Sequence, residues 1–115
     1  MSGTGAVVCL ITAPPAHAPR IAATAVEREL AACVNVVPLV HSIYRWQGQV
    51  QTDEESLLVL KTTSAEVPAL ERLLEEIHPH DTFELVALDV SAGSARYLEW
   101  IGATVGPNAA SPPAG

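Results

Sequence analysis

Short apolar runs alternate along this chain with longer amphipathic segments. The first run, residues 6–12, ends at a threonine and is followed by Pro14 and Pro15. A short run rich in β-branched residues is typical of a central strand that is buried on both faces. Residues 83–90 have a similar character, so we expect a second strand there. One side of this second strand would carry Glu84, whose carboxylate we expect to be partly buried.

Two amphipathic segments have the spacing of helices. In residues 18–33, apolar side chains recur about once per turn, at Ala22, Val26, Leu30 and Cys33. The second predicted helix begins after Ser64, a good N-cap residue, and ends at Pro79. Its apolar stripe consists of Val67, Leu70, Leu73, Leu74 and Ile77. A short third helix is expected over residues 95–104.

A long hairpin is predicted between the first two helices. Residues 34–46 have the pattern of a strand, and Pro38, which cannot donate a backbone hydrogen bond, places this strand at a sheet edge or at a bulge. A tight turn at residues 47–49 leads into a strand over residues 50–63. The polar residues 53–55 interrupt the strand pattern, and we expect them to be a solvated part of the hairpin.

The predicted order of elements is β-α-β-β-α-β with a short C-terminal helix. Two right-handed crossovers that share one sheet give an α+β, ferredoxin-like sandwich with both helices on one face. The chain has few charges to cover the other face, so we expect a homo-oligomer to bury it. The domain is predicted to span residues 1–105, and residues 106–115, rich in proline, glycine and alanine, to form a disordered tail.

Composition excludes several classes of protein. Of the 115 residues, 49% are hydrophobic and 17% charged, and the net charge is −7, which argues against nucleic acid as a partner. No apolar run approaches the ~20 residues that a membrane span needs. Residues 1–13 lack a basic region, so no secretory signal is expected and the cytoplasm is the predicted location. Phosphate-binding, nucleophile-elbow and zinc-protease motifs do not occur, so we predict no enzyme and no organic cofactor.

Residues 78–84 concentrate the polar chemistry of the chain. Two imidazoles and two carboxylates, those of His78, His80, Asp81 and Glu84, follow one another between the second helix and the last strand. Imidazole with carboxylate suits divalent metals such as copper or zinc. This segment is therefore the candidate metal site, although Pro79 separates the histidines and the spacing matches no known closed site. The two cysteines, Cys9 and Cys33, are expected to be reduced and buried.

Six short motifs, in order, resemble the CutA family of divalent-cation tolerance proteins. The resemblance runs from about Val7 to Ile101. The motifs are Thr12-Ala13-Pro14, Ala32-Cys33-Val34-Asn35-Val36, Ser42-Ile43-Tyr44-Arg45-Trp46-Gln47-Gly48, Leu60-Lys61-Thr62-Thr63, His78-Pro79 with Glu84, and Tyr97-Leu98-Glu99-Trp100-Ile101.

The resemblance implies a tight homotrimer, with hairpin strands that pair between subunits, and kinship with PII signalling proteins. It also implies a copper site, but the positions of the family's copper ligands are similar to Ile11, Ile77 and His78 here, so only one ligand is kept. Cys9 shares a strand face with Ile11 but is displaced by about 7 Å along the strand. It is no obvious replacement.

The resemblance further implies a ligand cleft between subunits, formed by Trp46, Lys61, His78 and Glu84. Lys61 or His78 could be the charge partner of Glu84. Tyr44 and Trp46 could pack across the trimer instead of forming a stacking platform for a ligand. The primary hypothesis is a protein of divalent-cation (copper) tolerance or response, which acts by binding a cation or a small ligand in this cleft. The alternatives are a PII-like sensor of a small anionic metabolite, with Lys61 as its charge partner, and a trimeric scaffold for protein partners.

Overall fold

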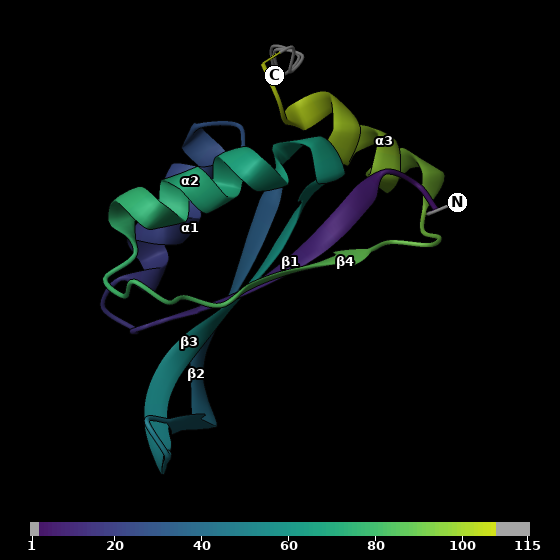
Figure 1. The fold of residues 1–115 in the computed structure, drawn as a ribbon. Coiled ribbons are helices and arrows are strands. Elements are labelled where there is room, and N and C mark those ends of the chain that lie inside the picture. The colour runs from purple at the N-terminus through teal and green to yellow at the C-terminus, as the bar shows by residue number, and fades with distance from the viewer. Residues whose placement is uncertain (1–2, 108–115) are drawn as a thin grey trace.

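Four strands form one antiparallel sheet in the order β2-β3-β1-β4, and the first two helices along the chain cover one of its faces (Figure 1). The computed structural model describes residues 3–107. Its elements are β1 (Ala6–Ala13), α1 (Ala18–Glu27), β2 (Cys33–Trp46), β3 (Gln49–Thr63), a 3-10 turn (Ser64–Glu66), α2 (Val67–Ile77), β4 (Leu85–Asp89) and α3 (Ala95–Thr104). The α+β, ferredoxin-like order predicted from the sequence is confirmed, including the bounds of the C-terminal helix.

The core lies between the helices and one face of β1 and β3. Cys9, Ile11, Leu58 and Leu60 are fully buried on the sheet side. The helices contribute Ala18, Ile21, Ala25, Leu70, Leu73 and Leu74. Small alanines on α1 allow the helix to approach the sheet closely. The expectation that β1 is buried on both faces is wrong for the single chain, because Val8, Leu10 and Thr12 on its other side are only half-buried.

α1 is shorter than the sequence pattern predicts. The helix ends at Glu27, and Glu29 has a positive φ of 61°, which breaks the helical path. Of the predicted apolar stripe only Ala22 is among the buried residues of this helix, and Val26 is 42% exposed. The buried residues of this helix are Ala18, Ile21, Ala22 and Ala25. The later predicted positions, Leu30 and Cys33, lie beyond the end of the helix.

The start of α2 also differs from the prediction. Ser64 does not cap the α-helix. It begins a 3-10 turn, and the α-helix starts at Val67, with a proline in its first turn. Proline is favoured there because its fixed φ suits a helix and its missing N–H would have no partner in the helix. The predicted apolar stripe is confirmed at its centre, where Leu70, Leu73 and Leu74 are buried.

β2 and β3 form a long hairpin joined by a two-residue turn. Trp46 pairs with Gln49, and Gln47 and Gly48 both have positive φ, as a tight hairpin turn requires. The predicted edge position of β2 is confirmed. A bulge is also present, because both Pro38 and Leu39 lie between the pairs Val37–Leu57 and Val40–Glu55, opposite Ser56 alone. The Ser56 hydroxyl donates to the Pro38 carbonyl at 2.8 Å.

β3 runs through the polar residues 53–55 without a break, and these residues are largely exposed, as predicted for a solvated part of the hairpin. Figure 1 shows the hairpin extending well beyond the helices. β4 is shorter than predicted: Phe83 and Glu84 precede it, and Val90 follows it.

The sheet face opposite the helices, which we call the open face, is largely apolar. The central residues Val8 and Leu10 of β1 lie there, next to Leu88 and Val86 of β4. Leu57 and Val59 of β3 extend the same surface. Leu88 is 49% exposed and Val86 45% exposed. An apolar sheet surface of this kind marks an interaction site.

The two ends of the described chain are anchored to the body. The amide of Gly106, the first residue of the predicted tail, donates to the Glu29 carbonyl at 2.9 Å, whereas residues 108–115 lie outside the described part of the chain. No helix within residues 3–107 is long and apolar enough to cross a membrane.

Candidate functional site

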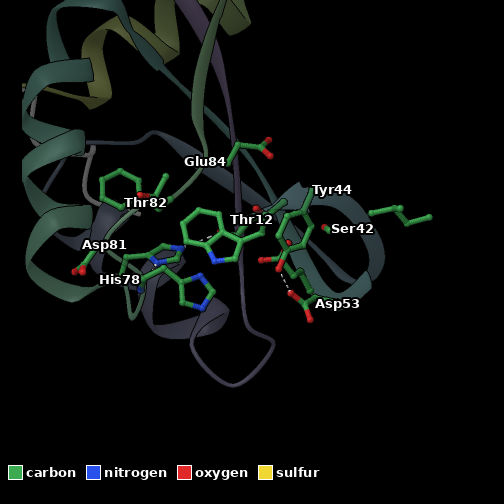
Figure 2. A pocket seen from close by; sticks show the side chains of 13 residues that line it. Thr12, Ser42, Tyr44, Asp53, His78, Asp81, Thr82 and Glu84 are labelled. Carbon is green, nitrogen blue, oxygen red and sulfur yellow. Dashed lines mark hydrogen bonds between the residues drawn. The ribbon is translucent and has the colours of Figure 1, made fainter. Parts of the chain in front are cut away.

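A cavity of about 660 Å³ lies between the hairpin and the loop that connects α2 to β4. We call it the acidic pocket, because its lining includes four carboxylates. It is lined by Thr12 from β1, by Ser42, Ile43, Tyr44, Trp46, Asp53 and Glu55 from the hairpin, and by His78, His80, Asp81, Thr82, Phe83 and Glu84 from the loop. Figure 2 shows Tyr44 and Asp53 on one side and His78, Asp81 and Thr82 on the other.

The two-residue turn determines which hairpin residues line the acidic pocket. Residues directly opposite each other on antiparallel strands point to the same face, and every second residue returns to that face. Ser42 pairs with Asp53, and Val40 pairs with Glu55, so these carboxylates share a face with Tyr44 and Trp46. The Tyr44 hydroxyl donates to the Asp53 carboxylate, a diagonal cross-strand contact. This bond is the main reason why the pKa of Tyr44 is raised.

His78 connects the loop between α2 and β4 to β1 through a hydrogen bond. The residue is only 8% exposed. Its Nε2 lies 2.9 Å from the carbonyl oxygen of Thr12, which can only accept, so Nε2 carries the proton and donates. Its Nδ1 accepts the backbone N–H of His80 at 3.0 Å. Both ring nitrogens are therefore occupied in one neutral tautomer.

The electrostatic setting of His78 favours this neutral form. Burial lowers its pKa most strongly, and the neighbouring imidazoles of His80 and His17 lower it further. The Thr12 carbonyl and the charge of Glu55 act in the opposite direction but do not prevail. The Phe83 ring, with its centroid 5.3 Å from that of His78, adds an apolar neighbour. His78 consequently anchors the loop and offers no free lone pair to a metal.

The other predicted metal ligands lie around the pocket without converging. The His80 ring is 5.2 Å from that of His78, centroid to centroid. Figure 2 shows the Asp81 carboxylate directed away from the hairpin. Glu84 is exposed, contrary to the expectation of partial burial, and it precedes β4, whose own residues after Leu85 are also exposed in the single chain. Within residues 3–107 no three His, Cys, Asp or Glu side chains are grouped to hold a metal ion.

Of the four predicted cleft residues, three line the pocket and Lys61 does not. Trp46, His78 and Glu84 are brought together from the hairpin and the loop. Lys61 lies four residues along β3 from Leu57, the partner of Thr12, which is about 13 Å at the usual strand rise. There its ammonium donates to the Asn35 side chain on β2. In the single chain, Lys61 is therefore neither the charge partner of Glu84 nor part of this pocket.

The sequence pattern missed the hairpin carboxylates. Asp53 and Glu55 were expected only to be solvated. The length of the turn carries the information that was missed. A two-residue turn at 47 and 48 sets a register in which Asp53 and Glu55 lie on the same face as Tyr44 and Trp46. A three-residue turn would place the two carboxylates on the opposite face.

The two cysteines differ in burial. Both thiols are free, as predicted, but only Cys9 is buried, whereas Cys33 is partly exposed, contrary to the expectation. Cys33 begins β2 at the edge of the sheet, where no further strand among residues 3–107 covers it.

Cys9 has no access to the pocket. Its side chain is fully buried, and burial raises the pKa of its thiol to about 11. We expect a Cys33→Ser variant to resist alkylation by iodoacetamide at pH 8 while folded and to take up one equivalent in denaturant, as mass spectrometry would show. Rapid alkylation of the folded variant would contradict this assignment and would reopen Cys9 as a metal ligand.

The charge of the pocket has one sign. Four carboxylates line it, and no lysine or arginine is among its lining residues. The ion pairs among residues 3–107 are Arg28–Glu76 and His41–Glu54, neither of which involves a pocket carboxylate. With the neutral His78, this arrangement attracts cations and repels anions.

The chain is similar to known proteins in both sequence and fold. A family model described as CutA1 divalent ion tolerance protein matches residues 7–104. A Thermus thermophilus relative described as a divalent-cation tolerance protein CutA is 47% identical over 95 residues, covering 82% of this chain and 92% of the relative. A mouse relative described as protein CutA is 44% identical over 84 residues. These are 73% of this chain but only 48% of the mouse protein, so the chain spans about half of that relative's length.

Solved structures agree in fold. The divalent cation tolerance protein (Cut A1) from Thermus thermophilus superposes with a TM-score of 0.86 at 45% identity, covering 88% of this chain and 99% of that one. A structure described as the PII-like protein CutA from Nostoc sp. PCC 7120, in apo form, superposes with a TM-score of 0.82 at 32% identity, covering 87% of this chain and 97% of that one.

Proposed function

This chain belongs to the CutA1 divalent ion tolerance protein family, and we propose on that basis that it acts by binding a cation in the acidic pocket and catalyses no reaction. The observation that carries the proposal is the charge of the pocket. Glu55, Glu84 and Asp53 line one cavity together with Asp81, and no lysine or arginine is among the lining residues. Such a cavity concentrates positively charged ligands.

A closed copper centre does not fit the residues of one chain. Copper favours imidazole and thiolate ligands. Both nitrogens of His78 are engaged, and the thiol of Cys9 is buried away from the pocket. Copper remains a prediction from the family resemblance, and any coordination by His80, Asp81 or Glu84 would need their side chains to move or a neighbouring subunit to add ligands.

We also propose that the protein is a homotrimer and that the pocket lies in a cleft between subunits. Two features support this. The open face is apolar and half-exposed, and the projecting hairpin carries exposed apolar residues, Ile43 and Val50 among them. Burying both in copies of the chain removes unfavourable contact with water. The pocket lies at the junction of the hairpin and the open face, so a neighbouring copy would complete its walls.

The main alternative is a PII-like sensor of a small metabolite. The description of the Nostoc relative as PII-like favours a ligand-sensing role. An anionic ligand, however, would meet four carboxylates in the acidic pocket, while Lys61 lies elsewhere on the sheet. The charge of the pocket therefore favours a cation over an anion. A scaffold for protein partners and a cytoplasmic location stay predictions from the sequence.

Titration of purified trimer with divalent cations tests the proposed function. We expect calorimetry with Cu²⁺, Zn²⁺ and Mg²⁺ to detect saturable binding that weakens about tenfold or more in the double variant Glu55→Gln/Glu84→Gln, since each lost carboxylate removes about 0.5–1 kcal/mol of attraction. Glu54→Gln is the matched control, because Glu54 alternates to the other face of β3 and pairs with His41. Equal affinities in wild type and the double variant would refute pocket binding.

A further inference from the structure

We propose that the cation held in the acidic pocket is organic, an amine with an apolar frame, and not a bare metal ion. This inference rests on the proposed cation-binding function and specifies its ligand. Three features of the pocket support it: the size of the cavity, the aromatic side chains that line it and the origin of its carboxylates in separate elements.

The cavity is far larger than a metal ion needs. Its volume of about 660 Å³ lies within the range of about 300–1,000 Å³ that is usual for small organic ligands. A metal site, by contrast, needs several ligand atoms within about 2–2.6 Å of one point. Residues 3–107 offer no group of three such side chains. In the single chain, before a neighbouring copy completes its walls, the pocket thus has room for a molecule with several heavy atoms.

Aromatic rings line the hairpin side of the cavity. Trp46 is 50% exposed and Tyr44 is 40% exposed, so both side chains are partly accessible to a ligand in the single chain. The hydrogen bond from Tyr44 to Asp53 holds that ring in place across the hairpin. Ammonium groups are attracted to the faces of such rings, most strongly to tryptophan, whereas a hydrated divalent metal ion gains more from oxygen ligands.

The carboxylates that line the cavity come from different parts of the chain. Asp53 and Glu55 project from β3, whereas Glu84 comes from the loop before β4. Neither Glu55 nor Glu84 takes part in an ion pair among the described residues. Separated acids can each receive one ammonium group of a flexible molecule, while its carbon chain lies against Trp46. A diamine matches both the charge and the apolar surface.

Putrescine, a short diamine, is the probe for this proposal. We expect calorimetry on the trimer to show saturable binding of putrescine that is tighter than that of Mg²⁺ or Cu²⁺, and none of its neutral diol analogue. Trp46→Leu should weaken putrescine binding about fivefold through loss of the ring face. Glu55→Gln should weaken it by a similar factor through loss of the charge.

Glu54→Gln should leave putrescine binding unchanged, since Glu54 points to the opposite face of β3. Size-exclusion chromatography and thermal unfolding of each variant check that assembly and fold are kept. Putrescine binding that is equally strong in Glu55→Gln and Glu54→Gln would be non-specific attraction to an acidic protein and would overturn the inference. If metal ions bind in a manner dependent on the pocket carboxylates and putrescine does not, the inference is wrong while the proposed function stands. If neither ligand depends on these residues, both are wrong.

Discussion

Replacing Leu88 by glutamate is expected to convert the proposed trimer into monomers. Leu88 lies on the open face beside Val8, and about half of its surface is exposed in the single chain. If copies of the chain cover this face, the substitution places an unpaired carboxylate in an apolar interface. Burying such a charge costs several kcal/mol for each subunit, and this cost opposes assembly. Light scattering after size-exclusion chromatography would show the mass fall towards the 12.1 kDa of one chain.

Val26→Glu is the matched control for this experiment. Val26 is also a half-exposed apolar residue, but it lies on α1, on the opposite side of the sheet. We expect this variant to keep the mass of wild type. A Leu88→Glu variant that remains trimeric would show that the open face is not the subunit interface, and it would remove the main support for a pocket shared between subunits.

His78→Ala is expected to lower the free energy of unfolding by about 2 kcal/mol at pH 7.5. The substitution removes the donor to the Thr12 carbonyl and the acceptor of the His80 amide, and it leaves both backbone groups without their partners in a nearly buried place. Urea unfolding at one fixed protein concentration measures the change. His80→Ala is the control, because it removes the ring but keeps the backbone amide that bonds to His78, and it should cost much less.

The same side chain predicts the direction of a pH dependence. Burial lowers the pKa of His78 in the folded chain below its usual 6.5. Above pH 6.5 the residue is neutral in both states, and its contribution to stability is complete. As the pH falls below 6.5, the unfolded chain takes up a proton that the folded chain does not, so stability decreases until the folded pKa is reached. His78→Ala should lose this component. If the stability of this variant falls as much as that of wild type between pH 6.5 and pH 5, other groups cause the fall.

The fold was predictable wherever one local pattern dominates. α3 has the predicted bounds, and the buried stripe of α2 has the predicted centre, because their apolar spacing has no strong competitor. α1 was overextended because apolar spacing continues past Glu27, while the left-handed conformation of Glu29, which ends the helix, leaves no mark in a hydrophobic pattern. Ser64 failed as a cap for a related reason, since the proline after Val67 starts the α-helix one turn later.

The site was predictable in part. The loop residues His78 and Glu84 and the hairpin residue Trp46 do line one cavity. The family resemblance brought Lys61 with them, but the register of β3 places Lys61 farther along the sheet. The function of His78 could not be derived from its neighbours in sequence, because the partner that fixes its tautomer, the Thr12 carbonyl, lies 66 residues earlier. Contacts of this range depend on the packed structure.

The bulge at Pro38 and Leu39 has a consequence for sequence divergence. Before the bulge, odd-numbered residues of β2 face the open side of the sheet, and after it, even-numbered residues do. Deleting one of the two residues would leave a single residue opposite Ser56, so Tyr44 and Trp46 would keep their cross-strand partners and their side of the sheet. What the deletion would remove is the local bend and the extra twist that a bulge gives to a strand. Relatives that lack the extra residue can therefore keep the same pocket residues on the same face, on a hairpin that projects at a different angle.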